Sequence, residues 1–320
     1  MASNDRIPQV AVLDDYQNAA LRLADWSVLE GRAAVTVFDD HLADADAVVE
    51  RLQGFDVLCA MRERTPLPRA TLERLPRLKL IVSTGARNAA IDTTAAAERG
   101  IEVAFTGYHS APTIEMTWAL ILAASRHLVA ENLAFRRGAW QQGVGVGLAG
   151  KTLGVLGLGR VGGAVARIGA QFGMTVIAWS PNMTPERAAE GGAMLVTKQE
   201  LLKQSDVLSI HMVLSPKTRG LIGVDDLALM KTSALLVNTS RGPLVDETAL
   251  VNALTSRKIA MAALDVFDVE PLPADHPLRS LENVLGTPHI GYVADDLYRV
   301  FYEDTVKAID AWLTARARPA

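Results

Sequence analysis

Short apolar runs alternate with longer segments of helical periodicity through the first hundred residues. The apolar runs predict strands at residues 10–13, 34–38, 57–61, 78–83 and 101–105, and the periodic segments predict helices at residues 19–24, 44–52, 67–75 and 93–99. Such alternation with short connections is typical of a parallel sheet covered by helices on both faces. We therefore expect a first α/β unit in this part of the chain.

The same alternation returns in the second half of the chain. Strands are expected at residues 153–156, 175–179, 207–211, 234–238, 260–265 and 283–285, with helices between them. A chain of 320 residues is long enough for two domains. We predict two doubly wound parallel-sheet domains, of which the first resembles a flavodoxin-like layer sandwich and the second a Rossmann fold.

Two further segments decide how the domains are connected. Residues 112–127 form a helical pattern that is too apolar for a surface helix, so we expect it to be buried between domains or between subunits. Residues 132–150 are expected to form an irregular arm. A last helix at residues 295–314 has no strand partner in the second unit and is expected to cover the first. The predicted domains are residues 1–107 plus 290–320, which make a discontinuous domain, and residues 108–289.

A glycine-rich turn separates the strand at residues 153–156 from a helical pattern at residues 160–172. A dinucleotide needs this order, because the glycines permit a tight turn, a close approach of backbone to pyrophosphate, and close packing of the helix on the strand. The phosphates then bind the N–H groups of the helix N-terminus. The alternative is a purely structural turn. The expected cofactor contacts are Gly157, Gly159, Arg160, Val161 and Gly162.

A second match to the same glycine spacing lies at residues 145–150. It follows a polar segment instead of a strand and precedes a strand instead of a helix. We expect these residues to form a loop without a nucleotide site.

Composition excludes several classes of function. Lys and Arg number 32 and Asp and Glu number 36, which gives a net charge of −4 and argues against binding to nucleic acid or to an anionic membrane. Cys59 is the only cysteine, so an internal disulfide and a cysteine-based metal site are excluded, and we expect it in the core. The N-terminal sequence has neither a basic nor an apolar signal region. We expect a cytoplasmic protein.

Three charged or titratable residues each follow a predicted strand of the second unit: Arg241, Glu270 and His289. Ligands of open α/β sheets bind in the crevice beyond the strand carboxyl ends, so these side chains can converge on one small molecule. Taken alone, each is more typical of a loop or surface residue.

In this order behind the glycine turn, the three residues resemble those of the NAD(P)-dependent D-isomer-specific 2-hydroxyacid dehydrogenases. The resemblance covers nearly the whole chain and implies that Arg241, Glu270 and His289 are catalytic. It implies an oxidoreductase that transfers a hydride between a nicotinamide cofactor and a small 2-oxo or 2-hydroxy acid, such as glyoxylate or hydroxypyruvate. A phosphoglycerate dehydrogenase-like activity is the less favoured enzymatic alternative.

The resemblance also assigns residues to the cofactor and the substrate. Asp265 matches the residue that holds the nicotinamide carboxamide, while Thr239 and His211 lie on strand ends that line the cleft. The substrate carboxylate is expected on the backbone amides of Thr84, Gly85, Ala86 and Arg87. No second ligand stands at metal-binding spacing beside His211, so no metal is predicted. The helix at residues 112–127 and the arm match the region that forms a homodimer in the family.

Two departures from the family pattern bear on specificity. Arg87 replaces a glycine, which suggests either a polar or anionic group on the substrate or a side chain in solvent. Ser180 stands where NAD-preferring members carry an Asp that binds the ribose. Ser180 and Asn182 are therefore expected to contact the cofactor, with NADP(H) slightly favoured over NAD(H), although Pro181 replaces a frequent Arg of phosphate-selective members.

A function of a different class also fits these motifs. Nucleotide-sensing interaction proteins share this fold and retain the Arg, Glu and His, so the motifs alone do not separate a sensor from an enzyme.

Overall fold

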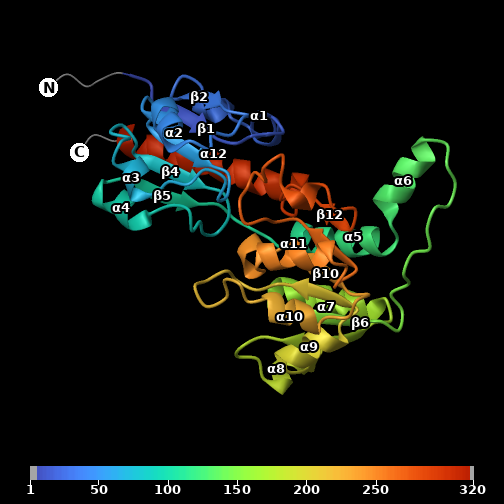
Figure 1. Cartoon of the computed structure of the whole chain (residues 1–320). Helices are drawn as coiled ribbons and strands as arrows, with labels where there is room; N and C mark the ends of the chain where they lie inside the picture. The colour runs from blue at the N-terminus through green and yellow to red at the C-terminus, as the bar shows by residue number, and fades with distance from the viewer. Residues whose placement is uncertain (1–5, 318–320) are drawn as a thin grey trace. The chain divides into compact units, whose positions relative to one another are not determined.

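The computed structural model describes residues 6–317, which form two compact units (Figure 1). Of the described residues, the first unit contains 6–109 and 293–317, and the second is Ser110–Tyr292. The chain thus leaves the first unit once and returns to it after the second is complete.

The first unit is built on a five-stranded parallel sheet with the order β2-β1-β3-β4-β5. Its strands are β1 (Gln9–Val12), β2 (Ala34–Val37), β3 (Val57–Ala60), β4 (Leu80–Ser83) and β5 (Glu102–Phe105). The central strands β3 and β4 are buried along their whole length, as expected for apolar runs covered on both faces. This order confirms the predicted flavodoxin-like arrangement.

The helices of the first unit are α1 (Ala20–Leu23), α2 (Ala45–Leu52), α3 (Arg69–Leu72), α4 (Thr93–Glu98) and α12 (Asp295–Ala317), with a 3-10 turn η1 (Ser27–Leu29). Asp44 and Asp92 cap α2 and α4 by accepting hydrogen bonds from the Ala47 and Ala95 amides. Helix α3 begins after Pro68, two residues later than predicted, and it ends at Leu72, three residues before the predicted end. Helix α12 packs against α1, η1 and β4, so the C-terminal segment belongs to this unit.

The second unit contains a seven-stranded parallel sheet with the order β12-β11-β10-β9-β6-β7-β8. Its strands are β6 (Thr152–Leu156), β7 (Thr175–Trp179), β8 (Met194–Leu195), β9 (Val207–Ile210), β10 (Leu235–Asn238), β11 (Met261–Leu264) and β12 (Val284–Gly286). The order reverses between β6 and β9, which makes a topological switch point of the Rossmann type and confirms the predicted fold. The two-residue strand β8 was not predicted.

The helices of the second unit are α5 (Ala111–Ser125), α6 (Leu128–Arg136), α7 (Arg160–Gln171), α8 (Pro185–Glu190), α9 (Lys198–Gln204), α10 (Val224–Leu229) and α11 (Glu247–Thr255), with 3-10 turns η2 (Gly242–Leu244) and η3 (Pro277–Arg279). None of the helices in the described part of the chain is long and apolar enough to cross a membrane.

Helix α5 packs its buried face on α7, β10 and β11 of its own unit. Its place between domains or between subunits stays a prediction. Trp118 of α5 packs against Phe172 with 4.8 Å between ring centroids and the ring planes tilted by 37°. The apolar character of α5 is therefore explained largely by the core of the second unit.

Helix α6 corrects the predicted irregular arm, because residues 132–136 belong to it and only the rest of the arm lacks regular structure. No side chain of α6 is buried. Residues 145–150 form a loop with no helix after it, as predicted for the second glycine match.

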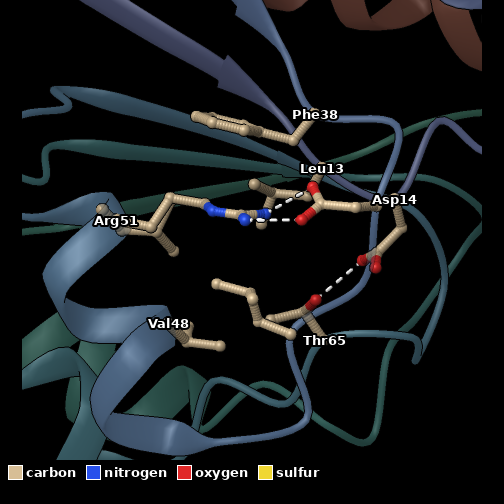
Figure 2. A pocket seen from close by; sticks show the side chains of 9 residues that line it. Leu13, Asp14, Phe38, Val48, Arg51 and Thr65 are labelled. Carbon is tan, nitrogen blue, oxygen red and sulfur yellow. Dashed lines mark hydrogen bonds and ion pairs between the residues drawn. The ribbon is translucent and has the colours of Figure 1, made fainter.

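A small hollow lies beside the carboxyl ends of β1 and β2 in the first unit (Figure 2). Arg51 of α2 makes two hydrogen bonds to the Asp40 carboxylate, at 2.7 and 2.6 Å, and its guanidinium lies 4.7 Å from the Phe38 ring centroid. Buried Asp14 accepts a hydrogen bond from Thr65 Oγ1 at 2.7 Å. The Asp14 contact ties the end of β1 to the loop after β3.

Candidate active site

The turn between β6 and α7 depends on two glycines at close backbone contacts. Gly157 has a left-handed φ of +96°, and a Cβ on it would lie 2.6 Å from the His211 carbonyl oxygen. A Cβ on Gly162 would lie 2.0 Å from the Gly157 carbonyl oxygen. A side chain at Gly157 would push the turn away from the end of β9, and one at Gly162 would push the first turn of α7 away from the end of β6.

The middle glycine of the turn has a different environment. A Cβ on Gly159 would meet no atom within 4 Å, so the chain leaves the space beside this backbone open. No side chain caps α7, and the N–H groups of a first helical turn lack partners within the helix. Arg160 is exposed there, and Val161 packs partly into the core. This arrangement fits a pyrophosphate at the helix N-terminus.

The other expected cofactor residues lie at the carboxyl ends of neighbouring strands. Ser180 follows β7, His211 follows β9, Thr239 follows β10 and Asp265 follows β11. Ser180 is half-buried, whereas Asn182 is exposed. The sheet is parallel, so the carboxyl ends of these four strands lie at the same end of the sheet. The sheet order places β7 on one side of the glycine turn after β6, and β9, β10 and β11 on the other.

Two of these residues are fixed by hydrogen bonds within the unit. Thr239 Oγ1 lies 2.8 Å from Thr117 Oγ1 of α5, and His211 Nε2 lies 2.8 Å from Ser209 Oγ. Burial lowers the pKa of His211 to about 4, so this imidazole is neutral at physiological pH. A neutral His211 adds no charge to this edge of the sheet.

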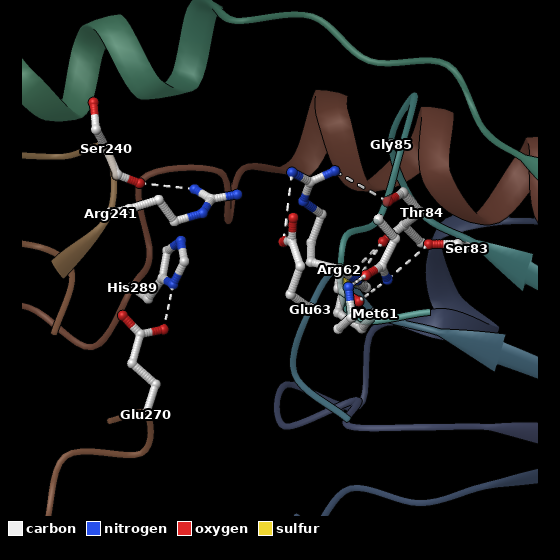
Figure 3. Close-up of polar contacts among 12 residues, drawn as sticks. Met61, Arg62, Glu63, Ser83, Thr84, Gly85, Ser240, Arg241, Glu270 and His289 are labelled. Atoms are coloured by element: carbon white, nitrogen blue, oxygen red, sulfur yellow. Dashed lines mark hydrogen bonds and ion pairs between the residues drawn. The ribbon is translucent and has the colours of Figure 1, made fainter. Parts of the chain in front are cut away.

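His289 and Glu270, two of the expected catalytic residues, form a hydrogen-bonded pair (Figure 3). Imidazole Nδ1 lies 2.5 Å from Glu270 Oε2, and the other carboxylate oxygen accepts a hydrogen bond from the Phe267 amide at 2.9 Å. The edge of the imidazole also meets Tyr292, with 5.4 Å between ring centroids. The carboxylate therefore fixes the ring from one side and leaves Nε2 as the nitrogen that can serve a substrate.

Arg241 follows β10, and the sheet order puts β10 and β12 on either side of β11. Its guanidinium donates to the Ser240 carbonyl oxygen at 2.7 Å, and its own carbonyl oxygen accepts from Asn238 Nδ2 at 2.9 Å. In Figure 3 the guanidinium of Arg241 turns to the Ser240 carbonyl oxygen, and a nitrogen of the His289 ring faces the Arg241 side chain. The second unit therefore brings the three proposed catalytic residues to one edge of its sheet.

The expected substrate loop follows β4 in the first unit. Thr84 and Gly85 are buried, whereas Ala86 and Arg87 are exposed. The Gly85 amide donates to Thr106 Oγ1 at 2.8 Å, so this amide already has a partner within the chain. A role in binding an anion therefore falls more naturally to the exposed part of the loop.

Arg62, which the sequence did not single out, lies directly over this loop (Figure 3). Its guanidinium donates to the Thr84 carbonyl oxygen at 3.1 Å, and a Cβ on Gly85 would lie 1.8 Å from Arg62 Nη1. Its backbone is left-handed, with φ of 52°, and its amide donates to Thr84 Oγ1 at 2.8 Å. Its place just after the predicted strand 57–61 is the signal that could have identified it.

A metal centre has no candidate in the part of the chain that the structure describes. Residues 6–317 contain no group of three or more His, Cys, Asp or Glu side chains arranged to hold a metal ion. Cys59 is buried in β3 as expected, and burial raises the pKa of its thiol.

The chain is similar to several known proteins over most of its length. The D-3-phosphoglycerate dehydrogenase of Methanocaldococcus jannaschii is 42% identical over 77% of this chain, but the match spans only 47% of that protein. The glyoxylate reductase of Aeropyrum pernix is 45% identical over 68% of each chain. The crystal structure of a phosphoglycerate oxidoreductase from Vibrio cholerae is 38% identical, covers 97% of this chain and 100% of that one, and has a TM-score of 0.91.

Residues 118–291, more than half of the chain, match the model of the D-isomer specific 2-hydroxyacid dehydrogenase NAD binding domain. The chain therefore belongs to the D-isomer specific 2-hydroxyacid dehydrogenase family.

Proposed function

We propose that the protein is an NAD(P)-dependent reductase of small 2-oxo acids, which runs in reverse as a D-2-hydroxyacid dehydrogenase in the cytoplasm. The observation that carries the proposal is the His289–Glu270 pair on the same sheet edge as the glycine turn. An imidazole fixed by a carboxylate is suited to exchange a proton with a reacting oxygen near neutral pH.

The nicotinamide cofactor supplies the hydride, and the protein supplies orientation and electrostatics. The amides at the start of α7 and the open space at Gly159 support binding of the pyrophosphate by this turn. Ser180 and Asn182 would contact the adenosine ribose, and His211, Thr239 and Asp265 the remainder of the cofactor. Because Ser180 carries no charge, we propose that NADPH is accepted at least as well as NADH.

His289 would protonate the substrate oxygen as alkoxide charge develops during reduction. Glu270 accepts from Nδ1 and so leaves Nε2 to deliver the proton. Arg241 would pair with the carboxylate and polarise the carbonyl through its planar donor fork. These three roles need an imidazole, a carboxylate and a guanidinium at one edge of the sheet, which is what the second unit supplies.

Thr84, Gly85, Ala86 and Arg87 would bind the acid's carboxylate or tail, assisted by Arg62. The guanidinium of Arg62 is held over the loop by Thr84, which supports a role in recognising an anionic group. Glyoxylate and hydroxypyruvate are the substrates we favour. A phosphorylated acid of the 3-phosphoglycerate type is the alternative that the names of two relatives support.

We further propose that the protein is a homodimer. The surface formed by α6 and the arm after it, residues 128–146, exposes several large apolar side chains, including Phe135, Trp140 and Val144, which are 63%, 73% and 94% exposed. An apolar surface of this kind is typical of a protein interface. A second copy of the chain is the partner that the family resemblance implies.

The deciding experiment measures oxidation of NADPH and NADH with a panel of 2-oxo acids that includes glyoxylate, hydroxypyruvate and 3-phosphohydroxypyruvate. Turnover of any member supports the enzymatic proposal. The order of the kcat/KM values identifies which substituent on the 2-oxo acid the protein recognises. Tight cofactor binding without turnover of a broad panel would instead support the nucleotide-sensing function.

A further inference from the structure

We propose that Asp265 acts mainly as a positioning residue, which holds the backbone of His289 in the conformation that the proton transfer requires. The inference rests on the proposed function of His289. It gives Asp265 a task within the protein that is separate from contact with the nicotinamide.

The backbone of His289 needs such support. Its φ is 52°, in the left-handed region that side-chain-bearing residues seldom occupy, and the cost of such a conformation is on the order of 1–3 kcal/mol. The hydrogen bond to Glu270 fixes the imidazole but not the backbone. Residues in strained conformations persist only where the surroundings enforce them.

The Asp265 carboxylate supplies that enforcement on both sides of His289. Oδ1 accepts hydrogen bonds from Thr287 Oγ1 at 2.6 Å and from the Ile290 amide at 2.9 Å, and Oδ2 accepts from the Gly291 amide at 2.7 Å. The three donors lie two residues before His289 and one and two residues after it. One carboxylate therefore spans the turn whose centre is His289.

Gly291 provides independent support for this interpretation. A Cβ at this position would lie 2.7 Å from Asp265 Oδ2, closer than real Cβ contacts allow. The glycine is therefore what permits the carboxylate to reach the turn. Its φ is not in the left-handed region, so the close approach, and not the backbone conformation, requires a glycine here.

The carboxylate is committed to these contacts. Asp265 is 1% exposed, and its three protein donors occupy most of the roughly four acceptor positions of a carboxylate. Burial is the main influence on this carboxyl and raises its pKa, while the hydrogen bonds from residues 287, 290 and 291 oppose the shift. These hydrogen bonds favour the ionised carboxylate, which accepts hydrogen bonds through both of its oxygens.

The test separates the position of the carboxylate from its charge. Asp265→Asn keeps the size of the side chain but replaces one acceptor oxygen by an NH₂ donor. This donor would face an N–H or O–H donor of the turn, so at least one hydrogen bond would be lost. Gly291→Ala keeps the charge and displaces the carboxylate. We expect each variant to lower kcat about 100-fold at saturating cofactor, since a misplacement of about 1 Å can cost that much. The double variant should be little worse than the more damaging single variant, because both changes break the same contacts.

A readout without turnover is amide hydrogen exchange of the segment 287–292. Exchange should rise about tenfold or more in both variants, because the Ile290 and Gly291 amides lose their acceptor.

Only Asp265→Asn should also move the pH at which kcat/KM for reduction declines, and the move should be toward lower pH, because the variant removes a negative charge that interacts with His289. Asp206→Asn is the matched control. The Asp206 carboxylate also accepts a hydrogen bond from a backbone amide, that of Thr152, but it lies before β9, at the amino-terminal ends of the strands.

Asp206→Asn should leave kcat within about twofold of the parent, whatever its effect on stability. The proposal is overturned if Asp265→Asn weakens cofactor binding but keeps kcat within threefold at saturation, or if exchange in residues 287–292 is unchanged. Failure of the parent to reduce any 2-oxo acid would contradict the proposed function instead, and the exchange result would still decide whether Asp265 holds the turn.

Discussion

His289 Nδ1 lies 2.5 Å from Glu270 Oε2, so the two side chains form one hydrogen-bonded unit at the end of the sheet. We expect His289→Gln to lower kcat for reduction by roughly 10²- to 10⁴-fold, since general acid catalysis contributes about that much. Cofactor affinity, measured by the quenching of protein fluorescence, should stay within a few-fold.

His276→Gln is a suitable control for this change. His276 Nε2 lies 3.1 Å from Glu247 Oε1, so it is also an imidazole paired with a carboxylate, but it has no assigned role in catalysis. Its kcat should stay within about twofold of the parent. A His289→Gln variant within a factor of three of the parent would remove His289 from the mechanism.

Two arginines are expected to read different parts of the substrate. Arg241→Ala should lower kcat and raise KM for every 2-oxo acid, because it removes a charge-assisted contact to groups that all of them share. Arg87 is exposed on the loop after β4, so Arg87→Gly should raise KM only for acids with a polar or charged tail. Glyoxylate, which has no tail, is the internal control. Equal losses across the substrate panel would show that Arg87 does not read the tail.

The exposed apolar arm predicts the assembly state. We expect a homodimer by sedimentation velocity at micromolar concentration. Phe135→Glu should shift it toward monomer, because a charge would be buried in an apolar interface. Phe105→Glu is the control, since Phe105 is 42% exposed in the other unit. A monomeric parent would show that residues 128–146 remain exposed in solution.

The fold could be predicted from the sequence because most strands are continuous apolar runs bounded by turns, as in β4 and β9. Helix α6 could not be recognised, because none of its side chains is buried within the chain and no single apolar face is required. Strand β8 has two residues, too few for any period to show.

The site was only partly accessible from sequence. Glu270 and His289 follow strands and match a family pattern, and the structure joins them by a hydrogen bond. The contacts of Arg62 and Asp265 could not be predicted from the sequence, because they depend on left-handed backbone conformations at Arg62 and His289. A glycine in a sequence can indicate a left-handed backbone, whereas an Arg or a His does not.

The partly buried imidazole of His211 predicts a loss of stability in acid. Burial lowers its pKa to about 4 in the folded protein, below the value of about 6.5 in an unfolded chain. Between these values the unfolded chain binds more protons, so the free energy of unfolding falls as the pH falls from about 6.5 to 4. The contribution is no more than about 3 kcal/mol.

His211→Gln should flatten this part of the profile, measured by urea unfolding at a series of pH values. His109→Gln, which alters a half-exposed side chain 3.5 Å from Asp296, should change the slope little. If His211→Gln leaves the slope between pH 6.5 and 4 unchanged, the imidazole is not held neutral in the folded protein.

Coenzyme choice is expected to depend on Ser180, which follows β7 where a carboxylate would select NAD(H). A carboxylate about 4 Å from a 2′-phosphate would be repelled by on the order of 4 kcal/mol at an effective dielectric near 20, and Ser180 imposes no such repulsion. Its hydroxyl can donate to a phosphate oxygen, and the exposed Asn182 can add an amide donor. Because Pro181 offers no charge, we predict only a modest preference for NADPH.

Ser180→Asp should lower kcat/KM with NADPH about tenfold or more, equivalent to roughly 1.4 kcal/mol, while kcat/KM with NADH is unchanged or improved. Ser180→Asn is the control, because it has the size of Asp without the charge, so NADPH should suffer much less. The loss with Ser180→Asp should also shrink as salt is added, since ions screen the repulsion at an exposed site. A parent enzyme that prefers NADH more than a hundredfold would show that a group other than a carboxylate at this position selects the ribose.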